Sequence, residues 1–139
     1  MLLKRAVWMT LIAYSLILAA VCLSPMGGDP ALVPSKTRRI INNMLHVPAF
    51  AVHAWLCILA VRPVLTRGIG RRALATGAFM ALLYGLVLEI GQGYVPGRVT
   101  SMGDMILNSI GILAAVVITW ALPRSRQPAR TESIEDVPD

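Results

Sequence analysis

Two carboxylates interrupt the apolar segments of this chain, and each is followed by an amide side chain at helical spacing. Glu89 precedes Gln92 by three residues, and Asp104 precedes Asn108 by four. Residues three or four apart are neighbours on a helix surface, so each carboxylate lies beside its amide. A carboxylate near a membrane surface can act as a general acid or base, and amides can hydrogen-bond a head group.

Arg98 and His46 complete the set of candidate functional residues. Arg98 follows the turn-forming sequence Val95-Pro96-Gly97, and a guanidinium there could hold a phosphate or a carboxylate. His46 lies near the start of an apolar segment, where an imidazole could orient or share a proton. We expect catalytic roles for Glu89, His46 and Asp104, and substrate-binding roles for Arg98, Gln92 and Asn108.

The composition of the chain indicates a membrane protein. Its 139 residues are 56% hydrophobic and only 14% charged, whereas about 25% of the residues of an ordinary soluble domain are charged. The formal net charge is +6, but the basic residues form short clusters between apolar runs and no basic face with interleaved aromatic residues. This distribution is typical of membrane topology signals, so nucleic acid is not an expected partner.

Four apolar segments, each about 18–21 residues long, match the length of a helix that crosses a bilayer. Closed barrels are built from shorter, alternating strands, so we expect an all-α membrane protein, a bundle of four transmembrane helices. The chain after residue 122 is rich in Pro, Ser and Arg and then acidic, which predicts a disordered cytoplasmic tail at residues 123–139. The expected helices cover residues 6–23, 41–61, 73–92 and 102–122.

The first apolar segment could be a retained helix or a cleaved signal peptide. Lys4 and Arg5 precede it, as they would in either case. The sequence Ala19-Ala20-Val21-Cys22 offers neither an Ala-x-Ala cleavage site nor the small residue that precedes the cysteine of a lipoprotein signal. A retained helix is therefore favoured. Cys22 and Cys57 fall at different depths of the expected bundle, so we expect no disulfide between them.

The distribution of Lys and Arg predicts the orientation of the bundle. With the N-terminus inside, nine of these residues fall on the inner side and four on the outer side, and cytoplasmic loops carry the excess of positive charge. The cluster of Lys36, Arg38 and Arg39 opposes this orientation. We expect a multi-pass protein of the plasma membrane with both termini in the cytoplasm and the turn at residues 93–101 outside.

The helix directions then bring the six candidate residues to one membrane face. The third expected helix ends there, and the second and fourth begin there, so the six lie within roughly 5–10 Å of one depth at 1.5 Å per residue. Gly111 and Ala115 continue the stripe of Asp104 and Asn108, and small residues let helices approach closely. We therefore expect this stripe to pack against the third helix.

Several of these residues also have a purely structural explanation. Ser101-x-x-Asp104 resembles a capping box at the start of a helix. Asn108 could serve only to bridge two helices, and we expect His53, two turns deeper than His46, to hydrogen-bond between helices.

Glu89 and Arg98 could form a structural ion pair, because an unpaired charge at this depth is costly. A divalent ion held by Glu89, Asp104 and His46 is also open. No ligand spacing requires such an ion, and we expect neither a metal nor a cofactor.

The motifs that carry these residues resemble those of the VanZ-like family of small integral membrane proteins, over about residues 20–118. They are Leu23-Ser24-Pro25, Leu45-His46, Tyr84-Gly85-x-x-x-Glu89-x-x-Gln92, Val95-Pro96-Gly97-Arg98 and Ser101-x-x-Asp104-x-x-x-Asn108-x-x-Gly111. The family pattern has an Asp-Lys pair before the histidine, where this chain has Asn42 and Asn43. An asparagine can hydrogen-bond there but cannot serve as a base.

The resemblance implies a role in the bacterial cell envelope, with teicoplanin resistance as the family's best-known theme. We expect a site at the outer membrane face that binds or modifies a lipid-linked envelope or polysaccharide precursor. The alternative is a non-enzymatic structural or assembly partner of envelope biosynthesis proteins. In both cases the lipid bilayer is an expected partner. The residues alone do not specify a reaction.

Overall fold

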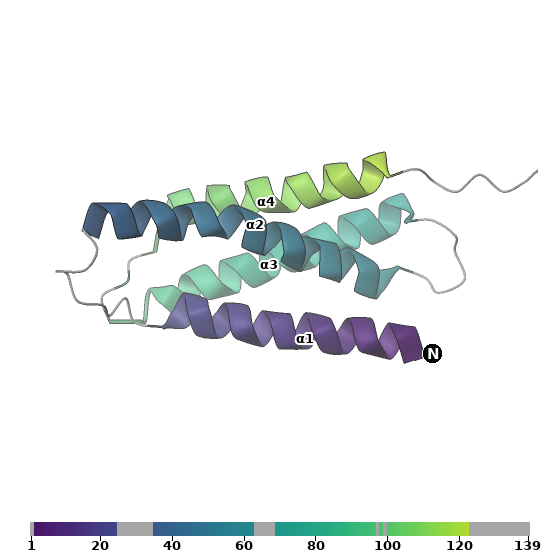
Figure 1. Cartoon of the computed structure of the whole chain (residues 1–139), viewed down its shortest axis with the longest axis horizontal. Coiled ribbons are helices and arrows are strands. Elements are labelled where there is room, and N and C mark those ends of the chain that lie inside the picture. Colours follow the sequence, from purple (N-terminus) through teal and green to yellow (C-terminus); the bar gives the residue numbers. More distant parts are fainter. Residues whose placement is uncertain (1, 25–34, 63–68, 97, 99, 123–139) are drawn as a thin grey trace, which may run out of the picture.

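The structure, a computed structural model, describes residues 2–24, 35–62, 69–96, 98 and 100–122, with the backbone alone for residues 35–43. These residues form four helices and no strand (Figure 1): α1 (Leu2–Leu23), α2 (Ser35–Val61), α3 (Arg71–Gln92) and α4 (Met102–Ala121). The predicted tail at residues 123–139 lies outside the described residues.

All four helices are long and apolar enough to cross a membrane, which confirms the predicted all-α membrane fold. Helix α2 begins at Ser35, six residues before the predicted start at residue 41. Residues 35–40 are mostly polar or charged, so hydropathy does not detect this first part of the helix. A helix can continue beyond the apolar layer because its backbone hydrogen bonds are internal.

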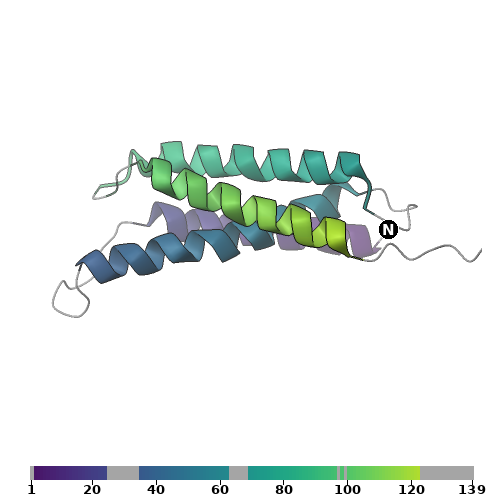
Figure 2. The ribbon, with the colours of Figure 1, turned by 90° about the horizontal axis from the view of Figure 1, so that it is seen from above.

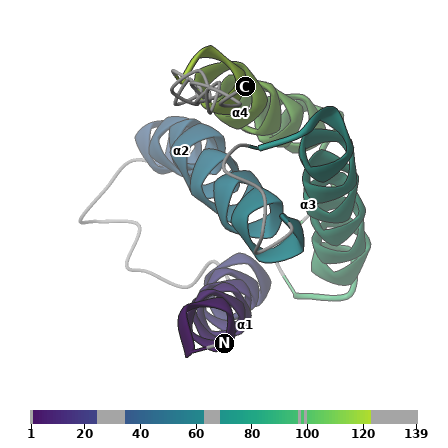
Figure 3. The ribbon, with the colours of Figure 1, turned by 90° about the vertical axis from the view of Figure 1, so that its right-hand side faces the viewer.

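The helices alternate in direction (Figure 1). Helix α2 lies between α1 and α4, with α3 at its side (Figure 3), and it contacts all three. It packs most extensively on α4 and then on α3, whereas α1 contacts α2 and α3 but has no contact with α4 among the described residues. Helices α3 and α4 also contact each other, and Figure 2 shows that they run at an angle to one another. At one end of the bundle, the ends of α1 and α3 meet the starts of α2 and α4.

Two glycines allow α2 to approach its neighbours closely. A side chain at Gly111 would overlap the carbonyl oxygen of Val47, and a Cβ at Gly77 would lie 2.6 Å from the backbone nitrogen of Ile58. At Gly111 the stripe therefore packs on α2 and not on the third helix as expected, whereas Asn108 of the same stripe lies beside Gly85 of α3, with Nδ2 3.5 Å from a Cβ placed at Gly85. Spacing along one helix identifies a face with small residues, but it does not identify the neighbour that occupies that face.

Pro48 lies inside α2 and affects its course. Proline lacks the N–H that an interior helical position donates and commonly kinks a helix. Figure 1 shows α2 bending along its length. Below Pro48, the fully buried side chains of Phe50, Cys57 and Ile58 form the centre of the core.

Candidate functional site

The imidazole of His46 joins α2 to α4 near the end of the bundle at which both helices begin. His46 Nδ1 lies 2.8 Å from Asn108 Oδ1, and a carbonyl oxygen can only accept, so Nδ1 carries the proton and donates it. The second ring nitrogen, Nε2, lies 3.9 Å from Asp104 Oδ2. This distance is too long for a hydrogen bond, so Nε2 and Asp104 face each other without satisfying each other.

Asp104 is 7% exposed, yet its Oδ1 has no hydrogen-bond partner among the residues that the structure describes. An unsatisfied buried acceptor is costly and calls for an explanation. The capping-box alternative does not supply it, because the Ser101 side chain makes no cap hydrogen bond at the start of α4. Asp104 lies in the first turn of α4, where the helix dipole stabilises negative charge.

The start of α4 is instead capped from the neighbouring helix. The backbone N–H of Ser101 donates to Glu89 Oε1, a contact between the last turn of α3 and the first residue before α4. The first N–H groups of a helix lack partners within it. Glu89 thus satisfies one backbone donor and fixes the turn between α3 and α4.

Gln92 and Arg98 hold the end of α1 against this turn. Gln92 Nε2 donates to the Cys22 carbonyl at 3.2 Å, and Arg98 donates through Nε to Ser24 O at 3.0 Å and through Nη2 to Val21 O at 3.3 Å. The last carbonyls of a helix lack internal partners, and a cation there also complements the helix dipole. Arg98 therefore caps α1, and no ion pair joins it to Glu89 within the described part of the chain.

The six predicted site residues thus lie at one end of the bundle in two groups of contacts. Those that are buried are His46, Glu89, Gln92, Asp104 and Asn108, while Arg98 is half-buried. In the first group side chains contact one another; its members are His46, Asp104 and Asn108. In the second group side chains contact backbone atoms; its members are Glu89, Gln92 and Arg98. No group of three or more His, Cys, Asp or Glu side chains in the described residues could hold a metal ion.

A column of aromatic rings runs inward from His46. The His46 and Phe50 rings are stacked with centroids 6.3 Å apart, Phe50 and His53 follow at 6.1 Å, and His53 and Tyr84 at 4.5 Å. His53 Nε2 also lies 3.5 Å from Ser15 Oγ of α1, the expected contact between helices. This column supports the site from below and packs it against α1, α2 and α3.

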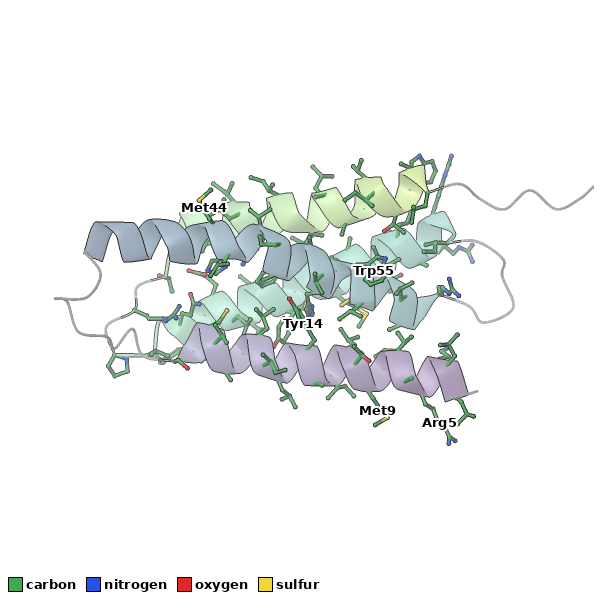
Figure 4. All side chains as sticks on the ribbon, viewed as in Figure 1. Arg5, Met9, Tyr14, Met44 and Trp55 are labelled. Atoms are coloured by element: carbon green, nitrogen blue, oxygen red, sulfur yellow. The ribbon has the colours of Figure 1, made fainter. Side chains whose placement is uncertain are left out.

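Two tyrosines of this region link helices through their hydroxyl groups, a role that the sequence did not predict. Tyr14 donates to the Ala49 carbonyl at 3.0 Å, and Tyr84 donates to the Ser15 carbonyl. Figure 4 shows Tyr14 pointing into the bundle, whereas Met9 and Met44 point away from it. A tyrosine near the middle of an apolar segment was the available signal, because a buried hydroxyl in a bilayer needs a partner.

The two cysteines, Cys22 and Cys57, are both buried and unpaired, as expected. The Cys22 backbone carbonyl accepts from Gln92, and the neighbouring Val21 and Ser24 carbonyls accept from Arg98, so the end of α1 borders the second group of site residues.

A protein-family model described as VanZ/LLP1 matches residues 5–123, which include all four helices except the first residues of α1. No curated protein and no solved structure matches the chain.

Proposed function

Because the chain belongs to the VanZ/LLP1 family and has four membrane-spanning helices, we propose that it binds the polar head group of a lipid-linked envelope precursor. The site of binding is the end of the bundle where α2 and α4 meet α3. A role in the cell envelope and in glycopeptide (teicoplanin) susceptibility would follow from an altered pool of such precursors.

The observation that carries this proposal is the unpartnered Oδ1 of buried Asp104 beside His46. Ionisable groups inside a membrane are costly, and they typically mark substrate or proton pathways. Asn108 fixes the His46 ring through Nδ1, which leaves Nε2 facing Asp104. In this proposal His46 and Asp104 face the ligand and can exchange a proton with it, whereas Asn108 positions His46.

The roles of the other three residues follow from their backbone contacts. Glu89 fixes the turn that leads into α4, and Gln92 and Arg98 keep the end of α1 beside the site. Arg98 still has N–H groups that these two carbonyls do not use, since a guanidinium has five donors. Those N–H groups are available to a phosphate of the ligand.

Profiling of lipid-linked precursors in cells lacking this protein tests the proposal. Cells complemented with the unchanged chain should regain the normal precursor pattern, and cells with Asp104→Asn should not, at equal protein levels in the membrane. Thr119→Val is a matched control, because Thr119 also has a buried unpartnered oxygen but lies near the other end of α4. A normal precursor pattern in the Asp104→Asn cells would contradict the proposal.

A second candidate function is that of a non-enzymatic partner of an envelope biosynthesis complex. The observation that favours it is that Glu89, Gln92 and Arg98 all contact backbone atoms of this chain, as structural residues do. Under this alternative Asp104→Asn would be tolerated, and bulky residues at Gly111 would abolish function. The same complementation assay separates the two candidates.

A further inference from the structure

A groove lies between α2 and α4, in the half of the bundle away from Asp104. It has a volume of about 230 Å³, and its mostly apolar lining includes Ala51, Val52, Trp55, Ala115 and Ile118. Ala51 lies ten residues before the end of α2, which is about 15 Å at 1.5 Å per residue. The hydrocarbon core of a bilayer is about 30 Å thick, so the groove lies at the depth of the acyl chains of one leaflet.

Arg62 lies on α2 at the end of this groove that is nearer the membrane surface. It follows Trp55 by seven residues, about two helical turns, so the two residues share one face of the helix. The Arg62 N–H donates to the Ile58 carbonyl at 3.2 Å, which continues the helical turn to this residue. The apolar groove is therefore followed by a cation on the same helix face.

The residue types at this end of the bundle are those that favour an anionic membrane surface. The loop of residues 62–72 has four arginines and no acidic residue, and Lys4 and Arg5 lie in the first turn of α1 at the same end. All the tryptophans of the chain lie within two turns of this end and are between 37% and 46% exposed; they are Trp8, Trp55 and Trp120. Tryptophan rings sit at the level of the head groups, and clustered basic residues attract anionic phospholipids.

From the groove, the position of Arg62 and this charge, we infer that the groove binds one anionic phospholipid of the adjoining leaflet. An acyl chain fills the apolar part, and the phosphate accepts hydrogen bonds from the guanidinium of Arg62. A second transmembrane helix suits the groove less well, because it would cover Arg62 with apolar side chains, and a charge in hydrocarbon is costly. The inference is independent of the proposed function, since Asp104 lies at the opposite end of α4.

The test compares lipids that share a phosphate and differ in net charge. The purified full-length protein is placed in nanodiscs with equal fractions of phosphatidylglycerol, phosphatidylcholine and phosphatidylethanolamine with the same acyl chains, and bound lipids are counted by native mass spectrometry. Phosphatidylglycerol should be enriched about tenfold over the other two, which have no net charge. Equal retention of the three lipids would overturn the inference. Acidic residues of the tail that occupied Arg62 instead would give the same result and the same conclusion.

Two matched variants separate a site in the groove from a general attraction of this end. Arg62→Gln and Arg5→Gln each remove one positive charge. Arg62→Gln should lower the enrichment about fivefold. Arg5→Gln should change it less than about twofold, because Arg5 points away from the bundle in Figure 4 and α1 has no contact with α4 among the described residues. Equal losses in the two variants would overturn the assignment to the groove.

The apolar part of the site is tested by filling it. Val52 lines the groove and is exposed, so the ring in Val52→Phe occupies the groove without entering the core. Leu113→Phe is the matched control, because Leu113 is exposed on α4 and does not line this groove. Val52→Phe should remove most of the enrichment and Leu113→Phe should leave it unchanged.

Inorganic phosphate distinguishes a lipid from a free anion. At millimolar concentration it should not displace phosphatidylglycerol, because it cannot fill the groove. Displacement by phosphate, or a normal enrichment in Val52→Phe, would overturn the binding of an acyl chain between α2 and α4.

Discussion

The carboxylate of Glu89, at the end of α3, accepts a hydrogen bond from the backbone N–H of Ser101, the residue from which α4 starts. A side chain on one transmembrane helix thus serves as the N-terminal cap of the next. The two helices and the turn between them are held in register by this contact. The sequence predicts a catalytic role for the same carboxylate. A test of that role therefore needs a variant that removes the charge of Glu89 and keeps its hydrogen bond to Ser101.

Glu89→Gln and Glu89→Ala should differ clearly in stability. Glutamine keeps an oxygen that can accept from Ser101, so the loss should be below about 1 kcal/mol, whereas alanine leaves a donor unsatisfied and should cost about 1–3 kcal/mol. Unfolding by sodium dodecyl sulfate in mixed micelles measures both. If Glu89→Gln abolishes complementation at normal stability, Glu89 acts in the function and is more than a cap.

Arg98→Ala should release the end of α1. Two hydrogen bonds from the guanidinium to α1 carbonyls are lost, and each contributes about 1 kcal/mol. Hydrogen–deuterium exchange in the last turn of α1 should rise, while exchange in the middle of α4 should not. Arg98→Lys keeps the charge but not the two-pronged geometry, so it should give an intermediate result. Unchanged exchange in Arg98→Ala would rule out the capping role.

His46 and Asn108 should be energetically coupled. In a double-mutant cycle with His46→Phe and Asn108→Leu, we expect a coupling of about 0.5–2 kcal/mol, the range found for hydrogen bonds between transmembrane helices. The two residues join α2 to α4 directly, so additive effects of the two substitutions would contradict the 2.8 Å contact.

Gly111→Ala should destabilise the bundle by about 1–3 kcal/mol or more, because the added methyl group overlaps the Val47 carbonyl and forces α2 and α4 apart. Gly70→Ala is the matched control: nothing lies within 4 Å of a Cβ at Gly70. Its cost should stay below about 1 kcal/mol, from the weaker helix cap alone. Equal losses in the two variants would argue against close packing at Gly111.

The orientation of the bundle in the membrane can be tested by labelling single engineered cysteines. The native Cys22 and Cys57 are buried, so they should react little with the label. Tyr94 is 86% exposed in the turn after α3, and Arg72 is exposed at the opposite end of the bundle. A membrane-impermeant maleimide should label Tyr94→Cys in intact cells and Arg72→Cys only after permeabilisation. The reverse pattern would move the site to the cytoplasmic face.

Residue type and spacing sufficed to predict the four helices and the clustering of the candidate residues at one end of the bundle. Glu89, Gln92, Asp104, Asn108 and His46 are indeed buried at one end of the bundle. Their partners could not be predicted, because most of them are backbone groups such as the Ser101 N–H and the Cys22 carbonyl, which any residue carries. The start of α2 was placed too late for a related reason: a hydropathy pattern detects contact with lipid, and helix formation does not require it.

The limited contact surface of α1 has a consequence for the order of assembly. Only Leu11, Leu18 and Cys22 of α1 are buried, and every polar contact that anchors its end comes from Gln92 or Arg98, about seventy residues later in the chain. During synthesis the end of α1 therefore lacks these partners until α3 and the turn after it have been made, whereas Tyr14 can already tether the middle of α1 to the Ala49 carbonyl of α2. The continuous apolar sequence of α1 allows its free end to remain in the bilayer during that interval.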